Sequence, residues 1–194
     1  YDERMRQRIV AEQEIVNEME RALSERQFEV YFQPKYDLGT ENIRGAEALV
    51  RWRHPTKGMM PPAEFIPVFE RNGFIMKLDE YIWDSVCAFL RKSLDAGIEP
   101  LPISVNMSRF DLYNEKLCDI LTGIVQKYDV DPKLLGLELT ESAYMENPQQ
   151  IIEITKKLQS HGFVILMDDF GSGYSSLNML KDVMVDVLKI DMHF

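Results

Sequence analysis

Short apolar runs alternate with amphipathic segments through most of this 194-residue chain, and this alternation restricts its fold more than any other feature. The strand-like runs lie at residues 101–108, 134–142, 164–170 and 185–191. Helical spacing of apolar residues separates them, as at 110–128 and 148–159. Strands and helices that alternate over short connections are typical of βαβ units with parallel strands. Right-handed crossovers close such units into a barrel whose active face lies at the carboxyl ends of the strands.

The first hundred residues follow a different pattern. Residues 28–34 and 43–52 read as two strands joined by turn residues, which predicts an antiparallel hairpin. Pro62 marks the start of a short helix, and a long amphipathic helix is expected over 76–96, ending at Gly97. Residues 1–26 have the spacing of an amphipathic helix. This helix either connects to an upstream domain, since the chain opens with Tyr1 instead of Met, or closes the bottom of the barrel.

Composition narrows the classes of function. Residues of hydrophobic type make up 45% of the chain, enough for a buried core, but no apolar run approaches the ~20 residues of a membrane helix. A net charge of −10 argues against sequence-independent binding to a nucleic-acid polymer. Cys87 and Cys118 lack metal-site spacing and read as buried free thiols, which favours a reducing, cytoplasmic location, although a longer parent protein could be anchored in a membrane.

Polar residues stand at or near the ends of the predicted strands: Glu47, Asn106, Glu138, Asp168, Asp169 and Lys189. Four of them also have an ordinary structural interpretation. Asp168 and Asp169 could form an Asx turn that caps a following helix, Glu47 could face solvent by strand alternation, and Lys189 could lie on a sheet edge. Because several of these residues come from different strands and would meet at one rim, we interpret them together as a site.

The chemistry of this set points to hard divalent ions. The carboxylates and the amide offer only oxygen ligands, which suit Mg²⁺ or Mn²⁺. Asp169 could help to hold a second ion, and two ions can activate a water and stabilise both oxygens of a phosphoryl displacement. Lys189 would then lie beside the water or the phosphate oxygens, and Arg51 is a candidate phosphate clamp.

The motif Glu47-Ala48-Leu49-Val50-Arg51 resembles the signature of the EAL family of cyclic di-GMP phosphodiesterases, and five companion motifs resemble those of the same family in the same order. The companions are Gln33-Pro34-Lys35, Asn106-Met107-Ser108, Glu138-Leu139-Thr140-Glu141, Asp168-Asp169-Phe170-Gly171-Ser172-Gly173-Tyr174-Ser175-Ser176-Leu177 and Leu188-Lys189-Ile190-Asp191. The resemblance covers residues 28–194 and implies an α/β fold, a modified (β/α)8 TIM-like barrel with an antiparallel first strand, here truncated after about the sixth strand. It divides the chain into a linker helix at 1–26, which could follow an upstream GGDEF domain, and an EAL domain at 27–194 without its last strands.

The resemblance also implies roles for individual residues. Glu47, Asn106, Glu138 and Asp168 would hold one metal ion, and Asp168 and Asp169 would share a second. Lys189 would assist the attacking water, and Glu141 would brace the loop that contains Asp168 and Asp169. The dinucleotide would be contacted by Gln33, Leu49, Arg51, Phe65, Ile66 and Pro67.

The activity implied for the complete domain is hydrolysis of cyclic di-GMP to linear pGpG with two Mg²⁺ or Mn²⁺ ions. The alternatives are a non-catalytic cyclic di-GMP receptor and an unrelated metal-dependent barrel hydrolase. Cyclic di-GMP is the expected partner; a homodimer and an upstream GGDEF or sensor domain are the others considered. The family's later carboxylate and glutamine have no counterpart in residues 1–194, so we expect little or no turnover from this segment alone.

Overall fold

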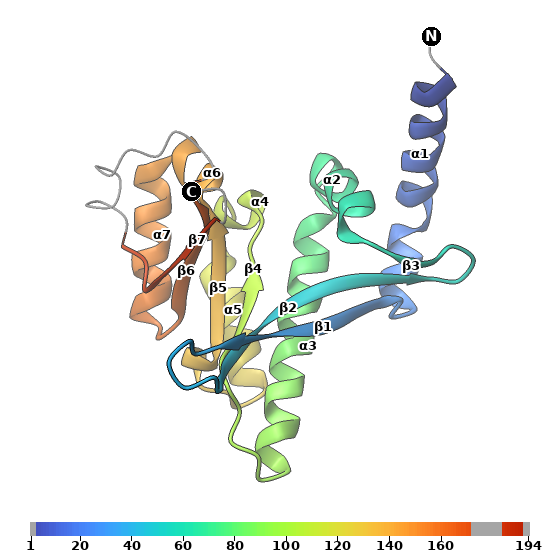
Figure 1. Ribbon diagram of the computed structural model, residues 1–194. Coiled ribbons are helices and arrows are strands. Elements are labelled where there is room, and N and C mark those ends of the chain that lie inside the picture. The colour runs from blue at the N-terminus through green and yellow to red at the C-terminus, as the bar shows by residue number, and fades with distance from the viewer. Residues whose placement is uncertain (1–2, 172–183, 192–194) are drawn as a thin grey trace.

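The computed structural model describes residues 3–171 and 184–191, which form a mostly parallel sheet flanked by helices (Figure 1). The strands are β1 (Phe28–Tyr36), β2 (Ile43–His54), β3 (Gly58–Met60), β4 (Ile103–Asn106), β5 (Leu135–Thr140), β6 (Val164–Phe170) and β7 (Val187–Ile190). Their order in the sheet is β1-β2-β4-β5-β6-β7, with β3 added beside β2. This arrangement confirms the predicted α/β fold class.

Strand direction separates the hairpin from the rest of the sheet. β1 pairs with β2 in antiparallel register, whereas β2–β4, β4–β5, β5–β6 and β6–β7 are parallel pairs. The predicted antiparallel hairpin is therefore confirmed. β3 is only three residues long, too few to show an alternating pattern, and it folds back on the end of β2, with Met60 opposite Trp52.

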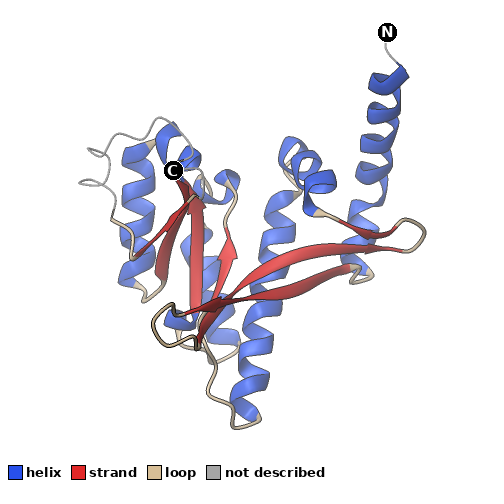
Figure 2. Ribbon diagram, viewed as in Figure 1, coloured by secondary structure: helices blue, strands red, loops and turns tan. Residues whose placement is uncertain are grey.

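Helices follow the strands as the alternation predicts (Figure 2). They are α1 (Glu3–Ser24), α2 (Pro62–Asn72), α3 (Ile75–Asp95), α4 (Arg109–Leu112), α5 (Leu117–Lys127), α6 (Glu141–Glu146) and α7 (Pro148–Ser160), with a 3₁₀ turn at Pro132–Leu134. In Figure 1, α2, α4 and α6 lie at the upper end of the molecule, where β4 and β5 end, and α3 and α7 run alongside the sheet. A short helix predicted at 177–181 lies outside the described residues.

Two helix boundaries differ from the sequence prediction. The single helix expected over 110–128 is divided into α4 and α5, because the Asn114 side chain accepts a hydrogen bond from the backbone of Lys116 and local turn bonding replaces helix there. The strand expected over 134–142 ends at Thr140. Its hydroxyl accepts a hydrogen bond from Ala143 N at 3.3 Å and caps α6, which starts at Glu141.

Aromatic side chains join the hairpin to α2. Phe28 of β1 and Trp52 of β2 have ring centroids 5.2 Å apart, and Phe65 and Phe69 of α2 pack against both rings. All four are buried. Burial of such large apolar surfaces contributes about 1.5–3 kcal/mol per side chain, so this cluster anchors α2 over the end of β2.

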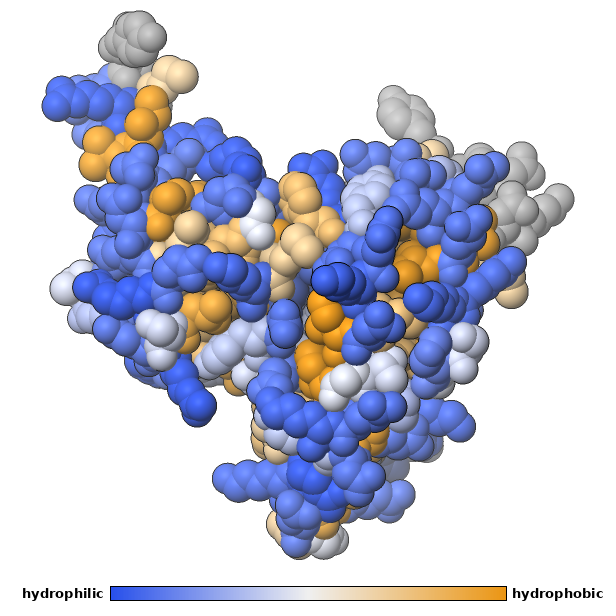
Figure 3. Space-filling view, turned by 180° about the vertical axis from the view of Figure 1, so that it is seen from behind, coloured by the Kyte–Doolittle hydropathy of each residue, from blue (hydrophilic) through white to orange (hydrophobic). Residues whose placement is uncertain are grey.

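The molecular surface drawn in Figure 3 is mainly polar. Figure 3 shows the rear face, where hydrophilic residues predominate and apolar residues lie in smaller patches. Among the described residues, no helix has both the length and the apolar character that crossing a membrane requires. Cys87 and Cys118 are buried free thiols, as predicted, and burial raises the pKa of Cys87 to about 12.

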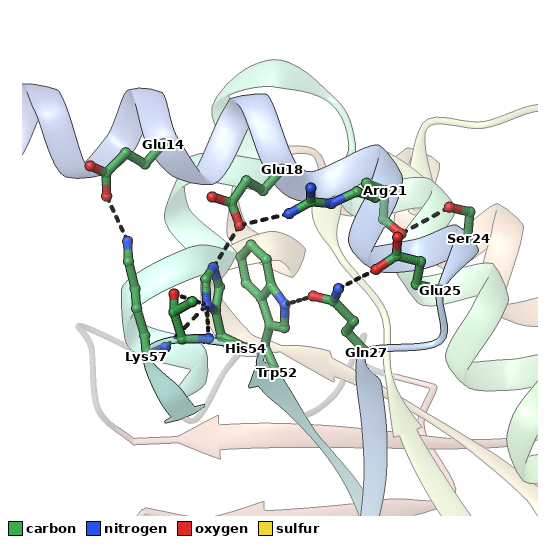
Figure 4. Close-up of polar contacts among 10 residues, drawn as sticks. Glu14, Glu18, Arg21, Ser24, Glu25, Gln27, Trp52, His54 and Lys57 are labelled. Carbon is green, nitrogen blue, oxygen red and sulfur yellow. Dashed lines mark hydrogen bonds and ion pairs between the residues drawn. The ribbon is translucent and has the colours of Figure 1, made fainter.

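The carboxyl-terminal half of α1 docks on the hairpin through charged residues (Figure 4). Glu18 accepts a hydrogen bond from His54 Nε2 at 2.6 Å, and Lys57 Nζ lies 2.7 Å from Glu14. His54 is buried, and its Nδ1 accepts hydrogen bonds from the backbone N–H groups of Thr56 and Lys57, so Nε2 carries the proton. The Glu18–His54 contact therefore fastens α1 to the end of β2.

Replacing Glu18 with Ala should lower the free energy of unfolding by about 1–3 kcal/mol, because it leaves the buried His54 N–H without an acceptor. Urea unfolding followed by circular dichroism measures the change. Glu20→Ala is the matched control on the same helix, since Glu20 pairs with Lys77 at the surface. Equal stability of the two variants would contradict the role given to Glu18.

Candidate active site

Three carboxylates from separate strands meet on one face of the sheet. Glu47 lies on β2, Glu138 on β5 and Asp168 on β6, and each offers an oxygen atom within 4.8 Å of the others. In the sheet, Glu47 is opposite Ser104 of β4, and Asn106 of β4 is opposite Glu138. The structure thus brings together three of the residues that the sequence analysis selected as metal ligands.

Lys189 of β7 lies among these carboxylates. Its Nζ is 2.9 Å from Glu47 Oε2, 2.8 Å from Glu138 Oε2 and 2.8 Å from Asp168 Oδ2. Burial acts to lower the pKa of Lys189, but hydrogen bonds from its ammonium to the three carboxylates outweigh burial and raise that pKa. Lys189 is therefore a protonated cation within the acidic cluster, where it balances part of the negative charge.

Glu138 is the most enclosed of the three acids. Its side chain is fully buried, and its second oxygen, Oε1, lies 2.7 Å from Lys35 Nζ. Burial acts to raise the pKa of Glu138, yet hydrogen bonds from Lys189, Lys35 and Ser104 together lower it. Glu138 is therefore held as a carboxylate, the form that binds a metal ion.

Asn106 and Asp169 are placed near the cluster but not within the group of three carboxylates. Strand alternation puts Asn106 on the same face as Ser104, at the exposed end of β4. Asp169 has a left-handed backbone, with φ of 57°, and donates its N–H to Asp168 Oδ1 at 2.9 Å. Partial burial and the neighbouring Asp168 and Asp191 raise the pKa of Asp169. The ligand roles of Asn106 and Asp169 stay predictions.

Glu141 connects α6 to the segment that follows β6. It is buried at the start of α6, and its Oε2 accepts a hydrogen bond from Gly171 N at 2.8 Å. Gly171 has a φ of 95°, a left-handed conformation that glycine adopts readily. This contact is the one that the predicted bracing role needs, and the role itself stays a prediction.

Replacing Glu141 with Ala should speed amide exchange at Gly171 by about 10-fold or more, because the N–H loses a buried, charged acceptor. Hydrogen–deuterium exchange measured by mass spectrometry reports this change. Glu146→Ala alters an exposed acid on the same helix and should leave the exchange unchanged. Unchanged exchange in the Glu141 variant would contradict the bracing role.

A cavity of about 320 Å³ opens beside the acidic cluster, between β2, α2, α3 and the end of β4. Leu49, Ile66 and Asn106 line it, together with the carboxylate of Asp79. Asp79 is buried, and no partner of its Oδ2 atom is found among the described atoms. Burial and then the nearby Asp111 raise the pKa of Asp79 well above its usual range. The cavity therefore combines apolar walls with two acidic residues, Asp79 and Glu70.

The other residues predicted to contact a ligand are placed differently. Gln33 lies opposite Glu47 in the β1–β2 ladder, and strand alternation puts Arg51 on the same face as Leu49. Phe65 does not line the cavity; it is fully buried in the aromatic cluster with Phe28 and Trp52. Pro67 is exposed within α2. Of the stretch 65–67, only Ile66 reaches the cavity.

Three site residues received no role in the sequence analysis: Lys35, Ser104 and Asp79. Alternation along β1 could have placed Lys35 on the face of Gln33 and Glu47. Asp79, an acid at a position on the buried face of α3, also carried a signal. Ser104 carried none, because serine is common in strands that bind nothing.

The sequence model of the EAL domain matches residues 16–194. The chain belongs to the EAL domain family. Its EAL domain is 37% identical over 187 residues to the cyclic di-GMP phosphodiesterase NbdA of Pseudomonas aeruginosa, which covers 96% of this chain and 24% of NbdA. It is 32% identical to the cyclic di-GMP phosphodiesterase PdeR of Escherichia coli, covering 98% of this chain and 28% of PdeR.

A solved structure has the same architecture as this EAL domain. The phosphodiesterase PaMucR, in complex with c-di-GMP, matches with a TM-score of 0.87 and 35% identity, covering 92% of this chain and 72% of that one. The chain spans about a quarter of the length of the curated relatives that it matches. The family and the fold are therefore established for this chain.

Proposed function

We propose that the complete EAL domain hydrolyses cyclic di-GMP to linear pGpG with divalent metal ions. The observation that carries the proposal is the meeting of Glu47, Glu138 and Asp168 around Lys189. The names of the relatives NbdA and PdeR support the reaction, and the c-di-GMP complex of PaMucR supports the ligand.

The donor set fits Mg²⁺ or Mn²⁺. Three carboxylate oxygens within 4.8 Å of one another, with an amide at the adjacent strand end, are hard ligands of the kind that these ions prefer. Glu47, Asn106, Glu138 and Asp168 would hold one ion, and Asp168 and Asp169 would share in holding a second. When bound, such ions lower the pKa of a coordinated water and stabilise charge on phosphate oxygens.

The protein's own residues would orient the phosphodiester. Lys189 brings a positive charge to the cluster and would bind a phosphate oxygen or position the attacking water. Arg51, on the same face of β2 as Glu47, would hold a second phosphate oxygen by its forked guanidinium. Together these cations would favour the more negatively charged transition state over the bound substrate.

The cavity would receive one base of the dinucleotide. Leu49 and Ile66 offer apolar surface for a flat ring, and Asp79 Oδ2 is a buried polar atom without a partner among the described atoms. Guanine presents both N–H donors and acceptors on its edges, and a buried polar atom without a partner favours a ligand that supplies one. Gln33, opposite Glu47, would contact the ligand from β1.

We also propose a cellular location and possible partners for the domain. We place it in the cytoplasm, where free thiols such as Cys87 and Cys118 stay reduced. α1 would join it to an upstream GGDEF or sensor domain, and a second copy of the chain could pair with it.

The test uses the full protein that contains this domain. Purified protein is incubated with cyclic di-GMP and Mg²⁺ or Mn²⁺, and pGpG is separated by ion-exchange chromatography. We expect pGpG to form, to disappear with EDTA and to return when the metal is restored. Binding of cyclic di-GMP without pGpG would instead support a receptor, and neither binding nor turnover would support an unrelated hydrolase.

A further inference from the structure

Lys35 lies against the acidic cluster but has no part in the proposed reaction. It is on β1, and its Nζ is 2.5 Å from Ser104 Oγ and 2.7 Å from Glu138 Oε1. β1 pairs only with β2 among the described strands, so Lys35 spans β2 to reach β4 and β5. A lysine near the end of a strand normally extends into water. This one is instead directed at the carboxylate buried deepest in the site.

Two small residues, Ser104 and Gly136, lie on the face of the sheet that carries Glu138. Gly136, two residues before Glu138, is opposite Ser104 in the sheet. A Cβ atom at Gly136 would lie 2.8 Å from Leu166 Cδ1 and 3.3 Å from Ser104 Cβ. A larger side chain at Gly136 would therefore clash with Leu166 and press on Ser104, the residue whose hydroxyl contacts Lys35.

Each oxygen of the Glu138 carboxylate contacts a different lysine ammonium. Lys35 holds Oε1, and Oε2 faces Lys189, Glu47 and Asp168. Lys35 contacts only Oε1, so Oε2, on the side of Lys189, is the oxygen that would face a metal ion bound in the cluster. Glu138 would then bind that ion through one atom instead of two, with its orientation fixed by Lys35.

Ligation through one oxygen discriminates between ions. Mg²⁺ is small and requires six ligands in near-ideal octahedral positions, whereas Ca²⁺ accepts six to eight ligands and often takes both oxygens of one carboxylate. Contacts that orient a metal ligand typically change metal affinity 10–100-fold when they are removed.

We propose that Lys35 is a positioning residue that restricts Glu138 to one metal-binding oxygen and thereby sets the preference of the site for a small octahedral ion over Ca²⁺. The inference rests on the proposed function, because it takes Glu138 to be a metal ligand. Lys35 touches neither substrate nor metal in this proposal, and it determines metal specificity through Glu138.

The test compares Lys35→Met with the unaltered protein, both as full chains. Methionine keeps the length of the side chain and removes the ammonium. The dissociation constants of Mg²⁺ and Ca²⁺ are measured by isothermal titration calorimetry, and the binding that disappears in Glu138→Gln is assigned to this site. Loss of one positive charge affects both divalent ions similarly, so the ratio of the two constants isolates the orientation of Glu138.

We expect Lys35→Met to shift the ratio toward Ca²⁺ by about 10-fold. Ser104→Ala removes a hydroxyl that contacts both Lys35 and Glu138 and leaves the ammonium of Lys35 in place, so it should shift the ratio in the same direction by less. It remains informative if Lys35→Met fails to fold. Lys57→Met is the matched control: Lys57 has similar exposure and a 2.7 Å ion pair with Glu14, away from the cluster. It should leave the ratio unchanged.

Two results would overturn the inference and are distinguishable. If Glu138→Gln abolishes metal binding but neither Lys35→Met nor Ser104→Ala moves the ratio by more than about twofold, the role of Lys35 is wrong and the proposed metal site stands. If Glu138→Gln binds both ions as the unaltered protein does, the metal site itself is wrong and the inference fails with it.

Discussion

Replacing Glu47 with Gln in the full protein is expected to lower kcat for cyclic di-GMP hydrolysis by about 10³-fold, since a metal centre supplies several kcal/mol of transition-state stabilisation. Glutamine preserves the size of the side chain but removes the charge that faces Lys189 and the predicted ion. Asp168→Asn removes a second ligand of the same set and should have an effect of similar size. Production of pGpG at saturating Mn²⁺ is the measurement.

The control for these variants changes an acid on the neighbouring strand. Glu29 of β1 is ion-paired with Arg53 and lies outside the cluster, so Glu29→Gln should keep near-normal turnover. Circular dichroism should show the same secondary structure for all variants. Normal turnover in Glu47→Gln would remove this residue from the metal site and withdraw the central support of the proposed function.

Lys189→Met is expected to destabilise the metal-free protein by about 3 kcal/mol, because it leaves three carboxylates close together without their shared cation. Mg²⁺ should recover much of this loss, since an ion that binds only the folded state stabilises it. The gain in melting temperature on adding Mg²⁺ should therefore be larger in the variant than in the unaltered protein. Differential scanning calorimetry with and without Mg²⁺ measures both effects.

Lys127→Met provides the comparison for Lys189. Lys127 pairs with Asp84 on the surface, so its loss should change the melting temperature little and leave the response to Mg²⁺ as it was. A Lys189 variant that melts like the unaltered protein, or that gains no more from Mg²⁺, would show that Lys189 does not balance the charge of the cluster.

The local pattern of apolar, polar and turn residues was sufficient to predict most of the sheet. Alternation along 28–34 and 43–52 and the turn residues between them correctly predict an antiparallel pair. Apolar runs followed by a polar residue correctly predict the parallel strands that contain Glu138 and Asp168. These features follow from backbone periodicity and turn chemistry, which neighbouring residues determine.

Contacts between distant segments could not be predicted in the same way. Lys35 and Glu138 are 103 residues apart, and no local pattern pairs them. The burial of Phe65 among Phe28 and Trp52 depends on where α2 docks, so the expectation that the whole stretch 65–67 faces a ligand did not distinguish Phe65 from Ile66. The division between α4 and α5 arises from side-chain hydrogen bonds that compete with helix bonding, a balance that apolar spacing does not report.

Because the two faces of β2 have different surroundings, the chain should tolerate insertions and deletions at some positions of the hairpin and not at others. Ala48, Val50 and Trp52 are buried in the core, and the residues that alternate with them, Glu47, Leu49 and Arg51, lie on the opposite face with the site. A one-residue insertion or deletion inside this strand would exchange the faces, exposing tryptophan and burying charge. The turn at 37–42 connects the same hairpin, and its positions 38–42 are exposed. These positions should accept added residues with little loss of stability.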